Sequence, residues 1–186
     1  MGEALWIFGY GSLMWDPGFD FGERQVARLA GYHRCFCMRS VHHRGTPDQP
    51  GLVLALDEQD GASCDGVGFA VPPDQAPTVL AYLRARELIS SAYLERVVPL
   101  RLSDGRRVQA LAYVVDRDHG QYCGGLALEE QARIIAGAIG GRGPNDDYLY
   151  RTADQLAKLG LADADLDWLA ARVRGIGQAS GTIGVG

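Results

Sequence analysis

The feature that most constrains this fold is a change in the hydrophobic period near Leu126. Before Val115, short apolar runs separated by turn residues predict strands, with one helical stretch among them. From Leu126 onward, apolar residues recur at helical spacing in successive segments. The sequence therefore predicts a sheet built from the first part of the chain and helices at its end.

Turn residues divide the strand-rich part, and glycines divide the helical part. We expect strands from Ile7, at 26–29 and 32–41 with a break or bend at Gly31, at 51–56, at 66–71, at 93–102 and at 108–115, with turns at 57–61 and 103–106. We expect helices at 75–89 with Asp74 as N-cap, from about Leu128, from a cap at Asn145 or Asp146 to Gly160, and at 163–174.

Composition excludes several classes of protein. With 186 residues, 47% hydrophobic and 22% charged, the chain suits one globular domain over 1–174, followed by a glycine-rich, mobile tail at 175–186. A net charge of −5 argues against nucleic acid or an anionic membrane as partner. Neither a membrane span nor a signal peptide is recognised, so a cytoplasmic protein with a small-molecule ligand is expected. The sequence does not define the oligomeric state.

A glycine-spaced turn follows the first strand, in the segment Ile7-Phe8-Gly9-Tyr10-Gly11-Ser12-Leu13. Glycines let backbone N–H groups approach a bound group closely, which suits an anion or an oxyanion. A dinucleotide fingerprint would need a third glycine where Met14 stands, and no P-loop lysine follows. A tight strand-to-loop turn without a ligand is the alternative interpretation.

The cysteines do not predict a metal centre. His33, Cys35 and Cys37 would share one face of a strand, but no fourth ligand follows at a suitable spacing. In a chain without a recognised export signal, these two cysteines, Cys64 and Cys123 are expected to be reduced thiols.

One carboxylate lies on an apolar helix face. In the helix expected at 75–89, Glu87 continues the stripe formed by Leu80 and Leu83. Burial and the negative end of the helix dipole both raise the pKa of a carboxyl group, which suits acid–base chemistry. The alternative is a structural ion pair with Arg84 or another arginine.

Several segments together form a pattern that extends in order to about residue 160. The first is Phe8 to Leu13 with Trp15 and Pro17 after it. The others are Gly31-Tyr32, Phe36, His43 to Pro47, Pro50-Gly51, Tyr82-Leu83, Arg86-Glu87, Tyr93, Asn145 and Tyr148-Leu149. This pattern resembles the ChaC family of glutathione-specific γ-glutamylcyclotransferases. One departure is Ile89-Ser90-Ser91-Ala92, where bacterial relatives usually place a glycine.

The resemblance implies an α+β fold with a mixed β-barrel-like sheet and flanking helices. It also implies conversion of glutathione to 5-oxoproline and cysteinylglycine without a metal or an organic cofactor. Glu87 would be the acid–base residue, the glycine turn would hold the γ-glutamyl group, and Tyr148 would close the site.

Two arginines are candidate partners for the substrate carboxylates, because guanidinium binds carboxylate through two hydrogen bonds. They are Arg39 and Arg44, and either could instead form an ion pair that holds the fold. Two alternative functions stay open: a cyclotransferase for other γ-glutamyl amides, and a non-enzymatic regulator associated with cation transport.

Overall fold

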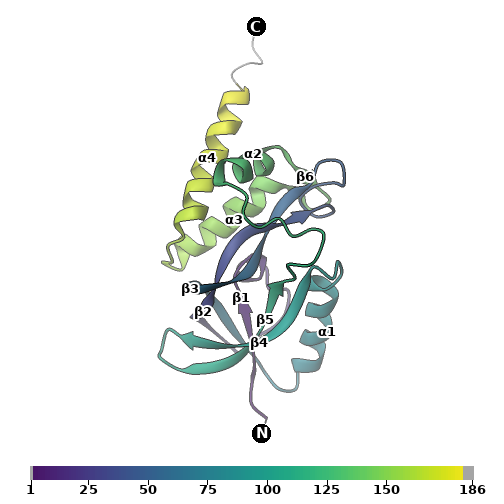
Figure 1. The fold of residues 1–186 in the computed structure, drawn as a ribbon. Helices are drawn as coiled ribbons and strands as arrows, with labels where there is room; N and C mark the ends of the chain where they lie inside the picture. Colours follow the sequence, from purple (N-terminus) through teal and green to yellow (C-terminus); the bar gives the residue numbers. More distant parts are fainter. Residues whose placement is uncertain (1, 182–186) are drawn as a thin grey trace. The chain divides into compact units, whose positions relative to one another are not determined.

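The computed structural model describes residues 2–181, which are shown in Figure 1. The main sheet is a closed barrel with the strand order β1-β3-β2-β4-β5. The chain divides into two compact units. The first comprises the residues up to Cys35 together with Ala55–Tyr122, and the second comprises Phe36–Leu54 and the chain from Cys123 onward.

The two longest strands of the barrel, β2 and β3, lie next to each other. The barrel strands are β1 (Leu5–Gly9), β2 (Glu23–Ser40), β3 (Gly51–Val71), β4 (Tyr93–Leu102) and β5 (Arg107–Val115). Strand β1 pairs antiparallel with β3 and parallel with β5, and β4 and β5 form a hairpin. Ile7, Phe8 and Phe69 are almost fully buried in the first unit, so the apolar strand residues form its core.

Two strands are longer than the sequence predicted. Residues 51–71 form one strand, so the turn predicted at 57–61 is wrong. Gly61, at φ +76°, lets the backbone change direction without ending the strand, and Gly31, at φ +82°, does the same within β2. The bend expected at Gly31 is therefore confirmed.

Helix α1 (Ala76–Glu87) belongs to the first unit. Its N-cap is Gln75, and no side chain caps it, so the prediction that Asp74 is the N-cap is wrong. The carbonyl of Pro72 accepts the N–H groups of Gln75 and Ala76 instead. The helix buries Leu83 completely.

The second unit contains the three helices predicted after residue 126, which lie together in Figure 1. They are α2 (Leu128–Gly137), α3 (Asn145–Lys158) and α4 (Ala164–Gly181), and the short strands β6 (Ile139–Gly140) and β7 (Gly143–Pro144) separate the first two. Arg172 of α4 forms two hydrogen bonds, at 2.6 and 2.8 Å, with the carboxylate of Glu129 on α2.

The last helix does not end at Arg174 as predicted but continues to Gly181. A glycine lowers helix propensity by only about 1 kcal/mol, so Gly175 and Gly177 do not stop a helix that is already propagating. The remainder of the predicted tail, 182–186, lies outside the described residues.

The architecture confirms the predicted α+β class, with a barrel and flanking helices. Within residues 2–181, no helix is both long enough and apolar enough to cross a membrane. A single domain over 1–174 stays a prediction.

Candidate active site

The glycine turn leaves the barrel at the end of β1. The chain passes from Gly9 into a short 3₁₀ helix, η1 (Ser12–Met14), with Tyr10 and Leu13 buried beneath the turn. A Cβ atom at Gly9 would lie 3.1 Å from both Leu13 and Phe69, which is tighter than ordinary contact. The close approach of the turn to β3 therefore favours glycine at this position, because any Cβ atom would displace Leu13 or Phe69.

Hydrogen bonds fix the orientation of the peptide groups in this turn. Three consecutive carbonyls accept them: Tyr10 from Arg34 Nε at 2.6 Å, Gly11 from the N–H of Met14 at 3.0 Å, and Ser12 from the N–H of Asp16 at 2.8 Å. A trans peptide directs its N–H opposite to its C=O. The N–H groups from Gly11 to Leu13 therefore point away from these donors, as an oxyanion cradle would require.

Arg34 was missed by the sequence reasoning. Arg34 is 8% exposed, and its guanidinium also donates to the backbone carbonyl of Asp65. Burial of a guanidinium is costly unless its donors are satisfied, so Arg34 is held in place where it fixes the turn. Nothing in the sequence distinguishes Arg34 from the three other arginines of β2, which are Arg24, Arg28 and Arg39.

Glu87 is the last residue of α1, and its carboxylate lies 3.2 Å from Nε of Arg86. The side chains of Glu87 and Arg86 are only 19% and 10% exposed, so the pair is shielded from water. The partner is not Arg84, which instead binds Glu95 of β4 at 2.8 and 3.0 Å. Glu87 thus has both properties considered from the sequence: a shielded position and an arginine partner.

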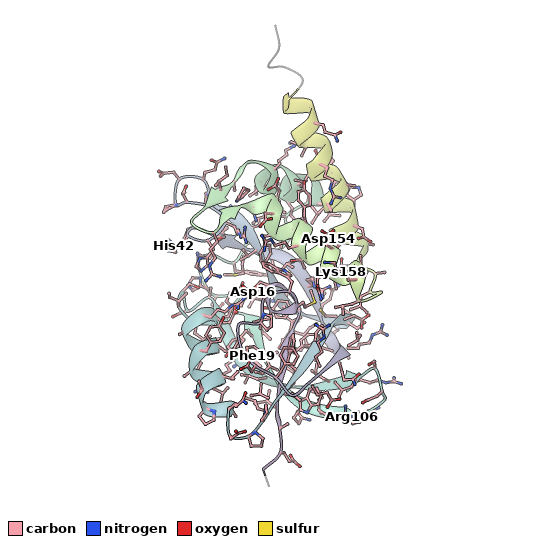
Figure 2. The ribbon with its side chains drawn as sticks, turned by 180° about the vertical axis from the view of Figure 1, so that it is seen from behind. Asp16, Phe19, His42, Arg106, Asp154 and Lys158 are labelled. Carbon is pink, nitrogen blue, oxygen red and sulfur yellow. The ribbon has the colours of Figure 1, made fainter. Side chains whose placement is uncertain are left out.

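Arg86 joins Glu87 to the glycine turn. Its Nη2 donates to the hydroxyl of Ser12 at 3.0 Å, and its Nη1 donates to the carbonyl of Asp16 at 2.7 Å. Figure 2 labels Asp16 in the loop that follows η1. Of the predicted site residues, those from Ile7 to Leu13 and Glu87 therefore lie in one unit and are connected through one guanidinium.

A buried tyrosine lies near the same carboxylate. Tyr113 is 2% exposed, and its hydroxyl donates to Glu95 at 3.2 Å. Burial raises the pKa of Tyr113, and the negative charges of Glu95 and Glu87 raise it further. Tyr113 is therefore a neutral hydrogen-bond donor beside these carboxylates at physiological pH.

The segment after Glu87 adopts the backbone conformation that favours glycine. Ser91 has φ +56°, in the left-handed region, although it carries a side chain. Its N–H donates to the carbonyl of Leu88 at 3.1 Å, which holds the turn. The segment therefore forms a turn of the kind that glycine favours, with a serine in the left-handed conformation.

The second unit holds the other predicted site residues. Asn145 does not cap α3, whose N-cap is Pro144, so the predicted cap is wrong. Its fully buried amide instead bonds both backbone groups of Leu52, with Nδ2 donating to O and Oδ1 accepting from N, each at 2.7 Å. Pairing a buried strand position in this way satisfies more polar groups than a cap would.

Arg44 and Tyr148 lie next to each other in this unit. The Arg44 guanidinium is 5.7 Å from the Tyr148 ring centre and donates to the carbonyl of Pro144 and to Asp147, at 3.0 and 3.3 Å. The Tyr148 hydroxyl accepts the N–H of Leu54 at 3.3 Å. These contacts fit the structural alternative for Arg44, while its role in substrate binding stays a prediction.

Arg39 is half-buried in the same unit, near Cys123. Burial raises the pKa of the Cys123 thiol, and the charge of Arg39 opposes that rise. The role of Arg39 in binding a substrate carboxylate is likewise a proposal.

The cysteines differ from the expectation of four reduced thiols. Cys35 and Cys37 are disulfide-bonded, whereas Cys64 and Cys123 are free. Residues two positions apart on a strand lie on the same face, which brings the side chains of Cys35 and Cys37 together. The expectation of reduced thiols is therefore wrong for these two cysteines.

Donor atoms of His33, Cys35 and Asp57 lie within 4.8 Å of one another. Protein groups already engage two of the three residues, because Cys35 is in a disulfide and Asp57 binds Arg117 at 2.6 Å and the Tyr122 hydroxyl at 2.8 Å. The charge of Arg117 already balances that of Asp57, so we assign no ion to this cluster.

Residues 5–176 match the model of the family described as ChaC-like protein. The chain belongs to the ChaC-like family. It is 40% identical over 170 residues to the glutathione-specific γ-glutamylcyclotransferase of Escherichia coli, covering 91% of this chain and 73% of that protein. It is 35% identical over 179 residues to γ-glutamylcyclotransferase 2-3 of Arabidopsis thaliana, covering 93% and 90% of the two chains.

A solved structure supports the same family. The yeast γ-glutamylcyclotransferase specific to glutathione has a TM-score of 0.85 and 25% sequence identity, covering 94% of this chain and 97% of the yeast chain. The barrel and the helices of this ChaC-like protein are therefore those of the γ-glutamylcyclotransferase fold. The resemblance predicted from the sequence motifs is confirmed.

Proposed function

We propose that this ChaC-like protein is a glutathione-specific γ-glutamylcyclotransferase that releases 5-oxoproline and cysteinylglycine. The names of its relatives support the substrate class. The structural observation that carries the proposal is the position of Glu87, which a single arginine connects to the glycine turn. An acid–base carboxylate beside an oriented set of N–H groups is what this reaction needs.

The substrate supplies its own nucleophile. The α-amino nitrogen of the γ-glutamyl group attacks the γ-carbonyl carbon and closes a five-membered ring, so the protein has mainly to hold the substrate folded. Glu87 accepts the proton that the attacking amine loses. Glu87 then donates this proton to the cysteinyl nitrogen as the carbon–nitrogen bond of the old amide breaks. Proton and charge balance at the end of the cycle without another reactant.

The turn from Ile7 to Leu13 would bind the γ-glutamyl group. Its N–H groups from Gly11 to Leu13 would stabilise the oxyanion that forms on the γ-carbonyl oxygen, and one such donor contributes about 3 kcal/mol in other enzymes. Arg39 and Arg44 would pair with substrate carboxylates, and Tyr148 would close the site.

The sharpest test is a panel of substrates assayed with the purified chain. Release of 5-oxoproline from glutathione is compared with release from γ-glutamyl dipeptides and measured by chromatography. A strong preference for glutathione supports the proposal. Equal turnover of all amides favours a general cyclotransferase, in keeping with the broader name of the Arabidopsis relative. Absence of turnover with every amide would contradict an enzymatic function and favour a non-enzymatic regulator.

The proposal includes a cytoplasmic location and no nucleic-acid partner. Fractionation of cells that produce the tagged protein tests the location. A gel-shift titration with duplex DNA and RNA tests for nucleic-acid binding and should produce no complex at physiological salt.

A further inference from the structure

Arg86 makes more contacts than an ion pair with Glu87 requires. Its Nε faces the Glu87 carboxylate at 3.2 Å, and its Nη2 donates to the Ser12 hydroxyl at 3.0 Å. Its Nη1 donates to the carbonyls of Asp16 and Pro17, at 2.7 and 3.3 Å, and to the Tyr82 hydroxyl at 3.0 Å. All three nitrogens of the guanidinium are therefore engaged.

These partners come from two segments that are distant in the sequence. Glu87 and Tyr82 belong to α1, whereas Ser12, Asp16 and Pro17 belong to η1 and the loop after it. Only a planar group with several N–H donors in fixed directions can reach both segments at once, and a lysine ammonium cannot reproduce that geometry.

A second observation indicates that the loop is pressed against α1 at this place. Gly18 has φ +73°, and a Cβ atom there would lie only 2.0 Å from the Tyr82 hydroxyl, which itself accepts from Arg86. A side chain at this position would therefore displace the Tyr82 side chain, to whose hydroxyl Arg86 donates, besides being strained at positive φ.

We propose that Arg86 is a positioning residue for the reaction, which holds the substrate-binding turn at a fixed separation from Glu87 and aims the Glu87 carboxylate. This inference rests on the proposed function. A positioning role can be told apart from a purely structural one. If Arg86 only stabilised the fold, its replacement would lower the unfolding free energy without changing the pH at which Glu87 titrates.

Two substitutions separate geometry from charge. Arg86→Lys keeps a positive charge but loses the fork of donors, so kcat should fall by about 100-fold, as expected for a displacement of about 1 Å, while the acid limb of the pH profile stays in place. Arg86→Gln also removes the charge beside Glu87. Its acid limb should move to higher pH, because an adjacent positive charge favours the ionised carboxylate.

The experiment measures 5-oxoproline release from glutathione against pH for the wild type and both variants, with thermal unfolding of each. Arg106→Lys is the matched control, since Arg106 is an exposed arginine that pairs with Glu23 and Asp104; its activity should stay within about twofold. A loss of kcat in both variants with a shifted acid limb in Arg86→Gln supports the inference.

Other outcomes overturn it. Activity of Arg86→Lys within threefold of wild type excludes a positioning role, and this variant decides the question if Arg86→Gln does not fold. An unshifted acid limb in a folded Arg86→Gln also excludes it. Absence of release by the wild type overturns the proposed function itself and this inference with it, so the two failures are distinguished by the wild-type arm.

Discussion

Replacing Asn145 should destabilise the chain far more than its position in the first turn of a helix suggests. The side chain is fully buried and satisfies both the N–H and the carbonyl of Leu52, at 2.7 Å each. Asn145→Ala leaves two buried backbone groups without these partners, and each such group costs about 1–3 kcal/mol. The expected loss in the free energy of unfolding is therefore about 2–6 kcal/mol.

Urea denaturation monitored by circular dichroism measures this loss, with Asp146→Ala as the matched control. Asp146 lies in the first turn of the same helix, where its interaction with the helix dipole is worth less than about 1 kcal/mol. A loss for Asn145→Ala no greater than that of the control would refute the reasoning, because it would mean that the Leu52 backbone finds other partners.

Asn145→Asp adds a test with a defined sign. A protonated carboxyl can still donate to the carbonyl of Leu52, whereas an ionised carboxylate cannot, so the fold favours the protonated form and raises the pKa of the introduced group. Relative to wild type, the stability of the variant should be greatest below the unfolded pKa of the introduced group, about 3.9, and should fall as the pH rises from there through the folded value. An unfolding free energy that rises with pH relative to wild type would contradict this.

Two further substitutions test the surroundings of α1. Gly18→Ala should lower stability and activity more than the matched change Gly61→Ala, because both positions have positive φ but only at Gly18 does the new Cβ meet Tyr82; denaturation and 5-oxoproline release check this. Hydrogen bonding to Arg84 lowers the pKa of Glu95, so this pair stabilises the fold above pH 4.5 and loses its effect as the pH falls through the lowered value. Glu95→Gln should flatten that acid dependence by less than about 1 kcal/mol, because Arg84 is 54% exposed, and an acid titration of the unfolding free energy measures it.

Periodicity predicted much of this fold because it is a local property. The change from strands to helices near Leu126 and the hairpin of β4 and β5 follow from side-chain spacing and turn residues. The continuity of β3 could not be predicted in this way. Its turn-like residues are kept extended by pairing with other strands, which a local pattern does not contain.

The part of the candidate site that depends on local sequence patterns was also predictable. Glu87 could be found because a carboxylate on an apolar helix face is a local signal. Arg34 and Arg86 act through hydrogen bonds to residues far along the chain, and nothing in the adjacent sequence shows those partners. Asn145 was misread as a cap because the sequence does not show that Leu52 lies against it.

The central claim is that Glu87 carries the proton transfers of glutathione cleavage. Its most direct test is 5-oxoproline release by Glu87→Gln, which keeps the size of the side chain and removes its proton-accepting carboxylate. Glu23→Gln is the matched control, a partly exposed glutamate that pairs with Arg106 in the same unit. We expect Glu87→Gln to retain its unfolding free energy and lose about 10²- to 10⁴-fold in kcat, while the control stays near wild type. Full activity in folded Glu87→Gln would contradict the account.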